Sequence, residues 1–229
     1  LEKLHPYLIS KHSPTKRVGA KPASKFSSIE HTIPMLSLSN AMDHQELIDF
    51  DLRIKKLLDK DRDVEYVMEP KLDGLAVEVV YENGYFKHGS TRGDGVTGED
   101  VSGNLKTIKA IPLKLLDSEI DISGIIEFRA EVFISHSDFK HLNKKRMEED
   151  NPVFANPRNC AAGSLRQLNP QVTSSRPLRI NFYSIGLKGN LSVNTQMELI
   201  KCMPTLGLPV NHLIKIGNGI DDVIKYYDY

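Results

Sequence analysis

The stretch VEYVMEPKLDGLAVEVVYENGYFKHGS, residues 64–90, decides the fold that this sequence predicts. Val64 to Met68 and Leu75 to Tyr81 are apolar runs rich in β-branched and aromatic residues, which is typical of strands. Asn83-Gly84 follows as a strong signal for a tight hairpin turn and leads into a third run, Tyr85 to Ser90. The stretch therefore predicts a strand, a sharp bend and then a β-hairpin.

Lys71 occupies that bend, between Glu69 and Asp73 and shortly before Gly74. Flanking sheet holds such an amine in one position, and a glycine lets a ligand approach the backbone closely. This setting suits an amine that attacks an electrophile, so Lys71 is a candidate covalent nucleophile. The alternative is an exposed lysine at a strand end, because lysine is rarely buried and Lys-x-Asp-Gly also occurs by chance.

The composition is that of a soluble globular protein rather than a membrane protein. Of 229 residues, 40% are hydrophobic and 26% charged, and no apolar run approaches the roughly 20 residues of a membrane helix. Cys160 and Cys202 are too few for a cysteine-only zinc site or a disulfide framework, so we expect reduced thiols in a cytosolic protein. The eight histidines show no metal-ligand spacing, and the missing initiator methionine and signal peptide suggest a piece of a longer protein.

Charge is balanced overall but not locally. The chain has 30 basic and 30 acidic residues, which argues against a protein that coats nucleic acid. Residues 151–190 nevertheless contain four arginines and one lysine and no carboxylate, which gives +5. A guanidinium group matches phosphate oxygens two at a time, so the stretch is a candidate phosphate-binding surface. The alternative is that carboxylates from elsewhere in the fold pair with these arginines.

Hydrophobic periodicity and capping signals predict the remaining elements. Leu1 to Leu8 has the character of a helix end, and Ser13 to Ser28 that of a linker arm on a surface. Asp43 and Glu46 imitate a capping box that opens an amphipathic helix ending near Lys60. We also expect a short helix or turn near Asn104, strands at 125–134 and 178–185, and helices at 137–147 with Ser137 as cap, 159–167 and 196–206. The mixture indicates an α+β protein with mainly antiparallel sheets.

Three charged residues, Glu127, Arg129 and Glu131, alternate along the strand predicted at 125–134. Residues two and four apart share one face of a strand, so all three side chains point the same way. A charged face on an otherwise apolar strand indicates a polar cleft rather than core. Structural ion pairing within the fold is the alternative.

Five segments gain meaning when they are taken together, in their order along the chain. They are Ser37 to Asn40, Glu69 to Gly74, Thr91 to Asp100, Glu127 to Phe133 and Phe154 to Leu168. From about Ser13 to Pro209 the chain closely resembles the adenylation domain of bacterial NAD-dependent DNA ligases. The resemblance implies a nucleotidyltransferase fold, with two antiparallel sheets flanked by helices around an adenylate cleft. It also implies that residues 1–34 are the tail of an N-terminal helical subdomain plus a linker arm, and residues 35–229 an adenylation domain truncated at its C-terminal end.

The resemblance implies a chemistry that agrees with the candidate lysine. Lys71 would attack the α-phosphorus of NAD, expel nicotinamide mononucleotide and carry AMP as a phosphoramidate. AMP then passes to the 5′-phosphate of a DNA nick, and the 3′-hydroxyl seals the nick in replication and repair. Mg²⁺ would assist, and zinc is expected only in a C-terminal region beyond Tyr229. The partners are nicked double-stranded DNA and NAD, with no membrane, for a monomer in the bacterial cytoplasm.

The same resemblance assigns roles to individual residues of this chain. The catalytic residues would be Lys71 and Asp73, the NAD or adenosine pocket would be formed by Ser37, Leu38, Glu69, Leu72, Arg92 and Glu131, and nicked DNA would be bound by Arg158 and Arg166. The chain departs from the family at Ala130, where glycine is usual, and at Cys160, where alanine is common. It ends before the family's Asp-Gly-Val-Val-Ile-Lys motif. An ATP-dependent nucleotidyltransferase and a catalytically inert adenylate- or nick-binding module are therefore kept as alternatives.

Overall fold

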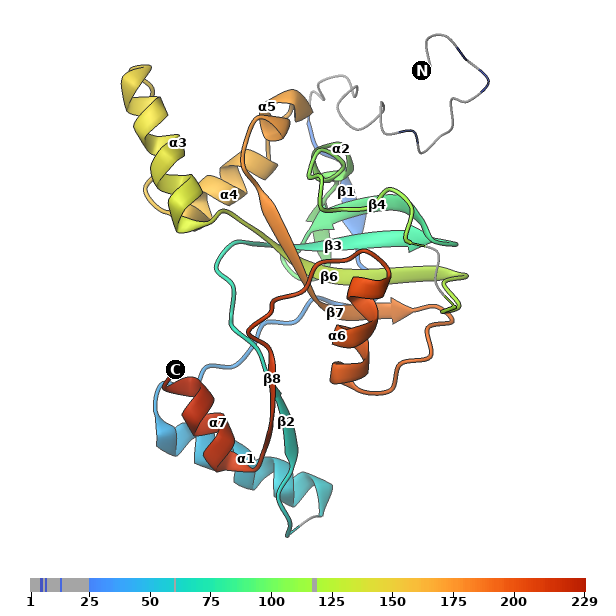
Figure 1. Ribbon diagram of the computed structural model, residues 1–229, viewed down its shortest axis with the longest axis vertical. Helices are drawn as coiled ribbons and strands as arrows, with labels where there is room; N and C mark the ends of the chain where they lie inside the picture. Colours follow the sequence, from blue (N-terminus) through green and yellow to red (C-terminus); the bar gives the residue numbers. More distant parts are fainter. Residues whose placement is uncertain (1–4, 6, 8–12, 14–24, 60, 117–118) are drawn as a thin grey trace.

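The computed structural model describes residues 5, 7, 13, 25–59, 61–116 and 119–229 (Figure 1). The strands in this part of the chain are β1 (Ser28–Glu30), β2 (Glu65–Met68), β3 (Leu75–Glu82), β4 (Tyr85–Thr91), β5 (Thr97–Glu99), β6 (Ile125–Phe133), β7 (Arg179–Lys188) and β8 (Lys215–Asn218). The helices are α1 (His44–Leu58), α2 (Ser102–Leu105), α3 (His136–Glu148), α4 (Pro157–Leu165), α5 (Pro170–Ser174), α6 (Gln196–Thr205) and α7 (Ile220–Tyr227). The protein is thus a mixed α and β structure, as predicted.

All paired strands are antiparallel. The main sheet has the order β4-β3-β6-β7, and β1-β5 and β2-β8 form two further two-stranded sheets among the described residues. The predicted hairpin is confirmed, because Glu82 pairs with Tyr85 across a turn in which both Asn83 and Gly84 have positive φ. The expected two sheets are therefore one four-stranded sheet and two short ribbons.

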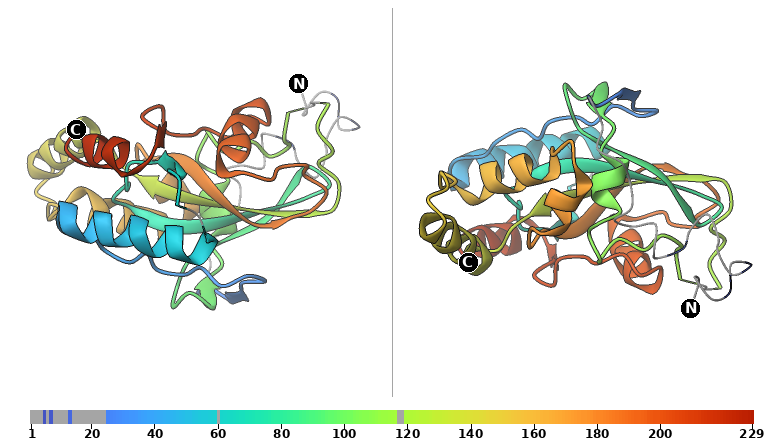
Figure 2. Two further views of the ribbon diagram at one scale, coloured as in Figure 1. Left: turned by 90° about the horizontal axis from the view of Figure 1, so that it is seen from below. Right: turned by 90° about the horizontal axis from the view of Figure 1, so that it is seen from above.

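The hydrophobic core lies on one face of the main sheet. Tyr81, Phe128 and Phe182, from three neighbouring strands, form a chain of edge-to-face ring contacts with centroids 6.0 and 6.1 Å apart. Helix α6 packs on β7 (Figures 1 and 2). Helix α2 and the segment after it supply Leu105 and Ile111, which are fully buried. Because one face of the sheet is filled in this way, the opposite face is left to carry polar side chains.

A smaller unit joins the main sheet through the bend after β2. It consists of the β2-β8 ribbon with α1 and α7, which lie side by side (Figures 1 and 2). Helix α1 begins as predicted after the cap residue Asp43, whose side chain accepts from the Glu46 amide. The Glu46 side chain accepts from the Met42 amide and not from the Asp43 amide, so the capping box is shifted by one residue. The amphipathic helix buries less apolar surface than its pattern predicts, because Asp51 is the only buried residue that α1 contributes. Its exposed leucines are Leu52, Leu57 and Leu58, whereas Leu47 is half-buried, since α7 and Tyr66 of β2 contact only part of the helix.

Several expected boundaries differ from the structure. Ser135 caps α3, not Ser137, because its hydroxyl accepts from the Asp138 amide at 3.1 Å. Helix α4 begins two residues earlier than predicted, since Asn156 caps it by accepting from the Asn159 amide at 2.7 Å. Most of the expected helix end at 1–8 and most of the linker at 13–28 lie outside the described residues. In the described part of the chain, no helix has the length and apolar character needed to cross a membrane.

Candidate functional site

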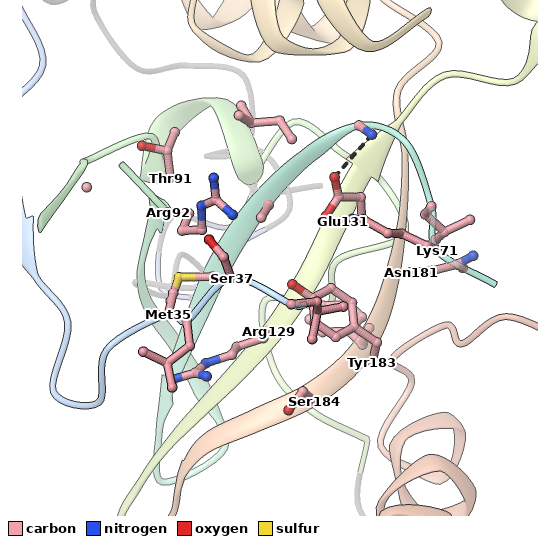
Figure 3. Close-up of a pocket in the computed structure, with 18 of the residues that line it drawn as sticks. Met35, Ser37, Lys71, Thr91, Arg92, Arg129, Glu131, Asn181, Tyr183 and Ser184 are labelled. Atoms are coloured by element: carbon pink, nitrogen blue, oxygen red, sulfur yellow. Dashed lines mark hydrogen bonds between the residues drawn. The ribbon is translucent and has the colours of Figure 1, made fainter. Parts of the chain in front are cut away.

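A cleft of about 940 Å³ opens on the polar face of the main sheet. Four parts of the chain form its walls: the bend between β2 and β3, the segment 35–38, the ends of β4, β6 and β7, and helix α4 (Figure 3). The lining residues among those predicted are Ser37, Leu38, Glu69, Lys71, Leu72, Arg92, Glu131, Arg158 and Arg166. The fold therefore brings together side chains that are up to 129 positions apart in the sequence.

The bend that carries Lys71 is held against β6. The Gly74 amide donates to Glu131 Oε1 at 3.1 Å, the bond drawn in Figure 3. A side chain at Gly74 would collide with the Val132 carbonyl, so the bend can lie this close only because the residue is glycine. The expected rigid setting of Lys71 thus has a physical cause, a short backbone contact between the bend and the neighbouring strand.

Glu131 is a carboxylate in a partly dry environment. Burial raises the pKa of its carboxyl above the ordinary value, while the charge of Lys71 and the Gly74 amide act in the opposite direction. With Oε1 engaged by Gly74, Oε2 is left to meet a ligand. The expected polar cleft along β6 is confirmed for Arg129 and Glu131, which line it. Glu127 is instead buried outside the cleft lining and accepts from the Leu187 amide at 3.2 Å.

Two side chains from distant parts of the chain were not anticipated at this site. Gln196, the first residue of α6, donates to Glu69 Oε1 and to the Tyr183 carbonyl, both at 2.7 Å. Burial raises the pKa of Glu69, although the Gln196 bond opposes this shift. Burial also raises the pKa of Tyr183 to about 12, so its ring stays a neutral phenol on the cleft wall. No local pattern in the sequence marks either residue, because the contacts of Gln196 join α6 to the bend after β2 and to β7.

The segment 35–38 covers one side of the cleft and is held by Arg129. The Arg129 guanidinium donates to the carbonyls of Ile33 and Pro34, at 2.8 and 3.1 Å. The Met35 amide donates to the Gly95 carbonyl at 2.8 Å. Ser37 and Leu38, which follow, therefore reach the cleft from a segment that is fixed at both the sheet and the loop after β4.

The two arginines predicted to bind DNA have carboxylate partners in this structure. Arg158 lies 3.2 Å from Asp73, which stands at the rim of the cleft, and Arg166 makes a two-pronged pair with Glu99 at 2.5 and 2.9 Å. Both partners come from elsewhere in the fold, as the alternative to phosphate binding supposed. The Arg158 pair is exposed and Arg166 is half exposed, so each pair contributes only about 0–1 kcal/mol and can exchange for another anion.

Potential metal ligands are scattered across the described residues. In residues 25–59, 61–116 and 119–229, no three His, Cys, Asp or Glu side chains gather closely enough to hold a metal ion. Cys160 and Cys202 are both free and buried, and burial raises the pKa of each thiol. The cleft therefore offers one amine, three carboxylates and four guanidinium groups for binding and chemistry.

Comparison with known proteins gives a consistent result. The family described as "NAD-dependent DNA ligase adenylation domain" matches residues 23–229. A DNA ligase of Geotalea daltonii is 51% identical over 229 residues, which covers 99% of this chain and 34% of that protein. A DNA ligase of Syntrophobacter fumaroxidans is 48% identical over 230 residues, with 100% and 34% covered. The chain spans about a third of the length of these curated relatives.

Proposed function

The chain belongs to the adenylation-domain family of NAD-dependent DNA ligases, and from this premise we propose that Lys71 becomes covalently joined to AMP taken from NAD. The observation that carries the proposal is the placement of Lys71 in the cleft, on a bend whose Gly74 amide is bonded to Glu131 and near enough for the charge of Lys71 to act on the Glu131 carboxyl. We infer further that the mixed fold is a nucleotidyltransferase fold, with residues 35–229 as the adenylation domain and residues 1–34 as an arm from a preceding helical subdomain.

The first step transfers an adenylyl group to Lys71. The lone pair of the neutral amine forms a nitrogen–phosphorus bond at the α-phosphorus, while the bond from that phosphorus to the bridging oxygen breaks. Nicotinamide mononucleotide leaves with the bridging oxygen, and the amine releases one proton. The chain's own part is to position the reacting atoms: a fixed bend keeps the amine in line, which is where most catalysis of phosphoryl transfer comes from.

The adenosine half of NAD fits the walls of the cleft. Glu131 Oε2, which Gly74 does not engage, would accept ribose hydroxyls, and Arg92 adds a positive charge at the end of β4. Ser37, Leu38, Glu69 and Leu72 would complete the pocket. Tyr183, a neutral phenol, supplies a flat surface without charge. This assignment follows the family's pattern residue by residue and agrees with the lining of the cleft.

Arg158 and Arg166 would bind the nicked duplex through its backbone phosphates. Both lie on or at the end of α4 at the cleft, and their carboxylate partners are exposed enough to be replaced by phosphate. Contacts of this kind are independent of base sequence, which suits an activity that must seal any nick. AMP would pass to the 5′-phosphate, and the 3′-hydroxyl would then displace it, in the cytoplasm of a bacterium and with the protein as a monomer.

Mg²⁺ belongs to the proposal in a limited way. The described residues offer Asp73 as an exposed carboxylate close to Lys71, but no cluster of three ligands. Such a donor set fits a magnesium ion that phosphate oxygens and water hold for the most part. Bound there, the ion would neutralise phosphate charge. Asp73 would then contact the ion and no longer pair with Arg158.

The test is the intact mass of the longest natural polypeptide that contains this chain, after incubation with NAD and magnesium or with ATP and magnesium. A gain of one AMP, about 329 Da, from NAD alone is the expected result. Lys71→Ala should lose this gain while the melting temperature stays unchanged, because a lysine on an exposed bend contributes little packing. A gain from ATP would favour the ATP-dependent enzyme, and no gain from either nucleotide would favour an inert binding module.

A further inference from the structure

A buried histidine connects two walls of the cleft without lining it. His31 Nδ1 lies 3.0 Å from Glu78 Oε2, and its Nε2 lies 3.1 Å from the backbone carbonyl oxygen of Arg92. The side chains of His31 and Glu78 are 0% and 2% exposed. The ring thus reaches the middle of β3 on one side and, on the other, the backbone of Arg92, whose side chain enters the cleft.

The hydrogen-bond partners fix one proton on the ring. A carbonyl oxygen only accepts, so Nε2 must carry a hydrogen and donate it to Arg92. A second proton lies between Nδ1 and Glu78, whether the pair is written as imidazolium and carboxylate or as imidazole and carboxylic acid. In both arrangements the same N–H group holds the Arg92 backbone.

His31 also holds the segment that leads to Ser37 and Leu38. Its own amide donates to the Val96 carbonyl at 2.9 Å, and β1 just before it pairs with β5, Ser28 opposite Glu99. The segment 28–38 is therefore tied to the loop after β4 by its backbone and to β3 by this one side chain. Arg129 completes the attachment further along, at Ile33 and Pro34.

Burial of the Glu78 carboxyl lowers the stability of the fold, so its presence in the core calls for an explanation. It sits in the central strand β3, and its Oε1 is buried with no hydrogen-bond partner among the described residues. Replacing such a pair by apolar side chains of similar volume is often neutral or stabilising, so stability alone does not account for it. What apolar side chains could not supply is the N–H group directed at the Arg92 carbonyl.

We propose that His31 is a positioning residue for the NAD site: its ring fixes the backbone at Arg92 and holds the segment with Ser37 and Leu38 against the sheet. The inference rests on the proposed binding of NAD in this cleft. The ring is bonded to Glu78 and to the Arg92 backbone and, among the described residues, makes no hydrogen bond to Lys71 or its bend. Its loss should therefore weaken NAD binding far more than it slows the transfer to Lys71.

The experiment compares two double variants with the wild type in the longest natural polypeptide. His31→Leu alone leaves buried Glu78 unpaired and should lower the melting temperature sharply. His31→Leu/Glu78→Leu removes both polar groups and should recover the melting temperature, yet keep a KM for NAD about tenfold above wild type, the loss expected for one hydrogen bond. The maximum rate of AMP loading should stay within about threefold. His31→Asn/Glu78→Gln, which keeps the site polar but cannot reach both partners, should show the same split.

Two controls and a second readout separate positioning from folding. Glu78→Gln can still donate an N–H to Nδ1 and so preserve the Nε2 hydrogen, and it should keep the wild-type KM. Asp51→Leu/Tyr66→Phe removes another hydrogen-bonded pair, 2.7 Å long and on the smaller unit, in which Asp51 is buried and Tyr66 half-buried, and should change the melting temperature without changing KM. In both His31 double variants the backbone amides at positions 31 and 35 should exchange hydrogen faster than in the wild type, since the segment is released.

The outcomes distinguish the two proposals. A wild-type protein that gains no AMP from NAD would remove the proposed function before any variant is compared. A wild-type protein that is loaded, together with a folded double variant whose KM for NAD and amide exchange equal the wild type's, would overturn the role of His31. An equal loss in KM and in maximum rate would also overturn it, because the defect would then extend to the chemistry at Lys71.

Discussion

Gly74→Ala is the sharpest single test of how the bend controls Lys71. Gly74 ends the bend three residues after the lysine, and its amide donates to Glu131. A Cβ atom there would lie 3.0 Å from the Val132 carbonyl carbon and 3.1 Å from Glu131 Cγ, and closer still to the Val132 oxygen. The nearest atoms belong to the backbone carbonyl of Val132 and not to the end of a flexible side chain, so the bend itself has to shift.

The size of the shift follows from contact distances. Carbon atoms in contact prefer separations of about 3.5–4.0 Å, and the closer Val132 oxygen requires a larger shift than the carbon contacts do, so the bend must move by about 1 Å. Overpacking of this kind costs roughly 1–3 kcal/mol of stability. A displacement near 1 Å at a reacting group can slow the reaction by about 100-fold. We therefore expect the rate of AMP loading from NAD to fall about 10- to 100-fold, with the melting temperature lowered by several degrees.

The assay is single-turnover loading of AMP, followed by intact mass, with thermal unfolding measured in parallel. Gly163→Ala in α4 is the matched control, because its Cβ would meet only Phe154 at 3.7 Å, an ordinary contact. Alanine in place of glycine inside a helix gains up to about 1 kcal/mol, so this control should be at least as stable and load AMP normally. A Gly74→Ala protein that loads AMP at the wild-type rate would refute the argument that the bend positions the lysine.

Two further predictions concern charge. Burial raises the pKa of Glu131, so the protonated carboxyl stabilises the fold below its unfolded pKa of about 4.3, and this stability is lost as pH rises through the folded-state pKa. Glu131→Gln should therefore flatten the decline of melting temperature above about pH 4, and parallel curves would contradict this. Glu99→Gln frees Arg166 and should tighten binding of a nicked duplex about 1.5- to 5-fold at low salt, an effect that fluorescence anisotropy should show fading with added salt. Unchanged or weaker binding would argue against Arg166 as a phosphate ligand.

The sequence predicts well wherever the deciding signal is local. The hairpin at Asn83-Gly84 requires positive φ at two adjacent positions, and few dipeptides accept that. The polar face of β6 follows from the two-residue period of a strand. Caps are less certain, because Ser135 and Ser137 both lie at the start of the same helix and only the backbone geometry selects Ser135.

Short strands and ion pairs cannot be obtained in this way. Strands β1, β5 and β8 have three or four residues each, too few to show a period, and each forms only because a distant partner presents an edge. The arginine stretch shows the same limit. Its lack of carboxylates is visible in the sequence, but Asp73 lies 85 positions from Arg158 and Glu99 lies 67 from Arg166.

The His31–Glu78 pair shows what the sequence pattern predicts and what only the structure supplies. A glutamate inside the apolar run LAVEVVY shares a strand face with Ala76 and Val80, so the pattern alone indicates a buried carboxyl that needs a partner. It cannot say which of eight histidines, or which arginine or amide, supplies it, and the partner lies 47 positions upstream. Sequence reasoning therefore gives the requirement, while the fold gives its solution. A buried carboxyl whose partner also holds the backbone of a cleft residue is better explained by positioning than by stability, because an apolar pair would stabilise the same sheet without holding anything.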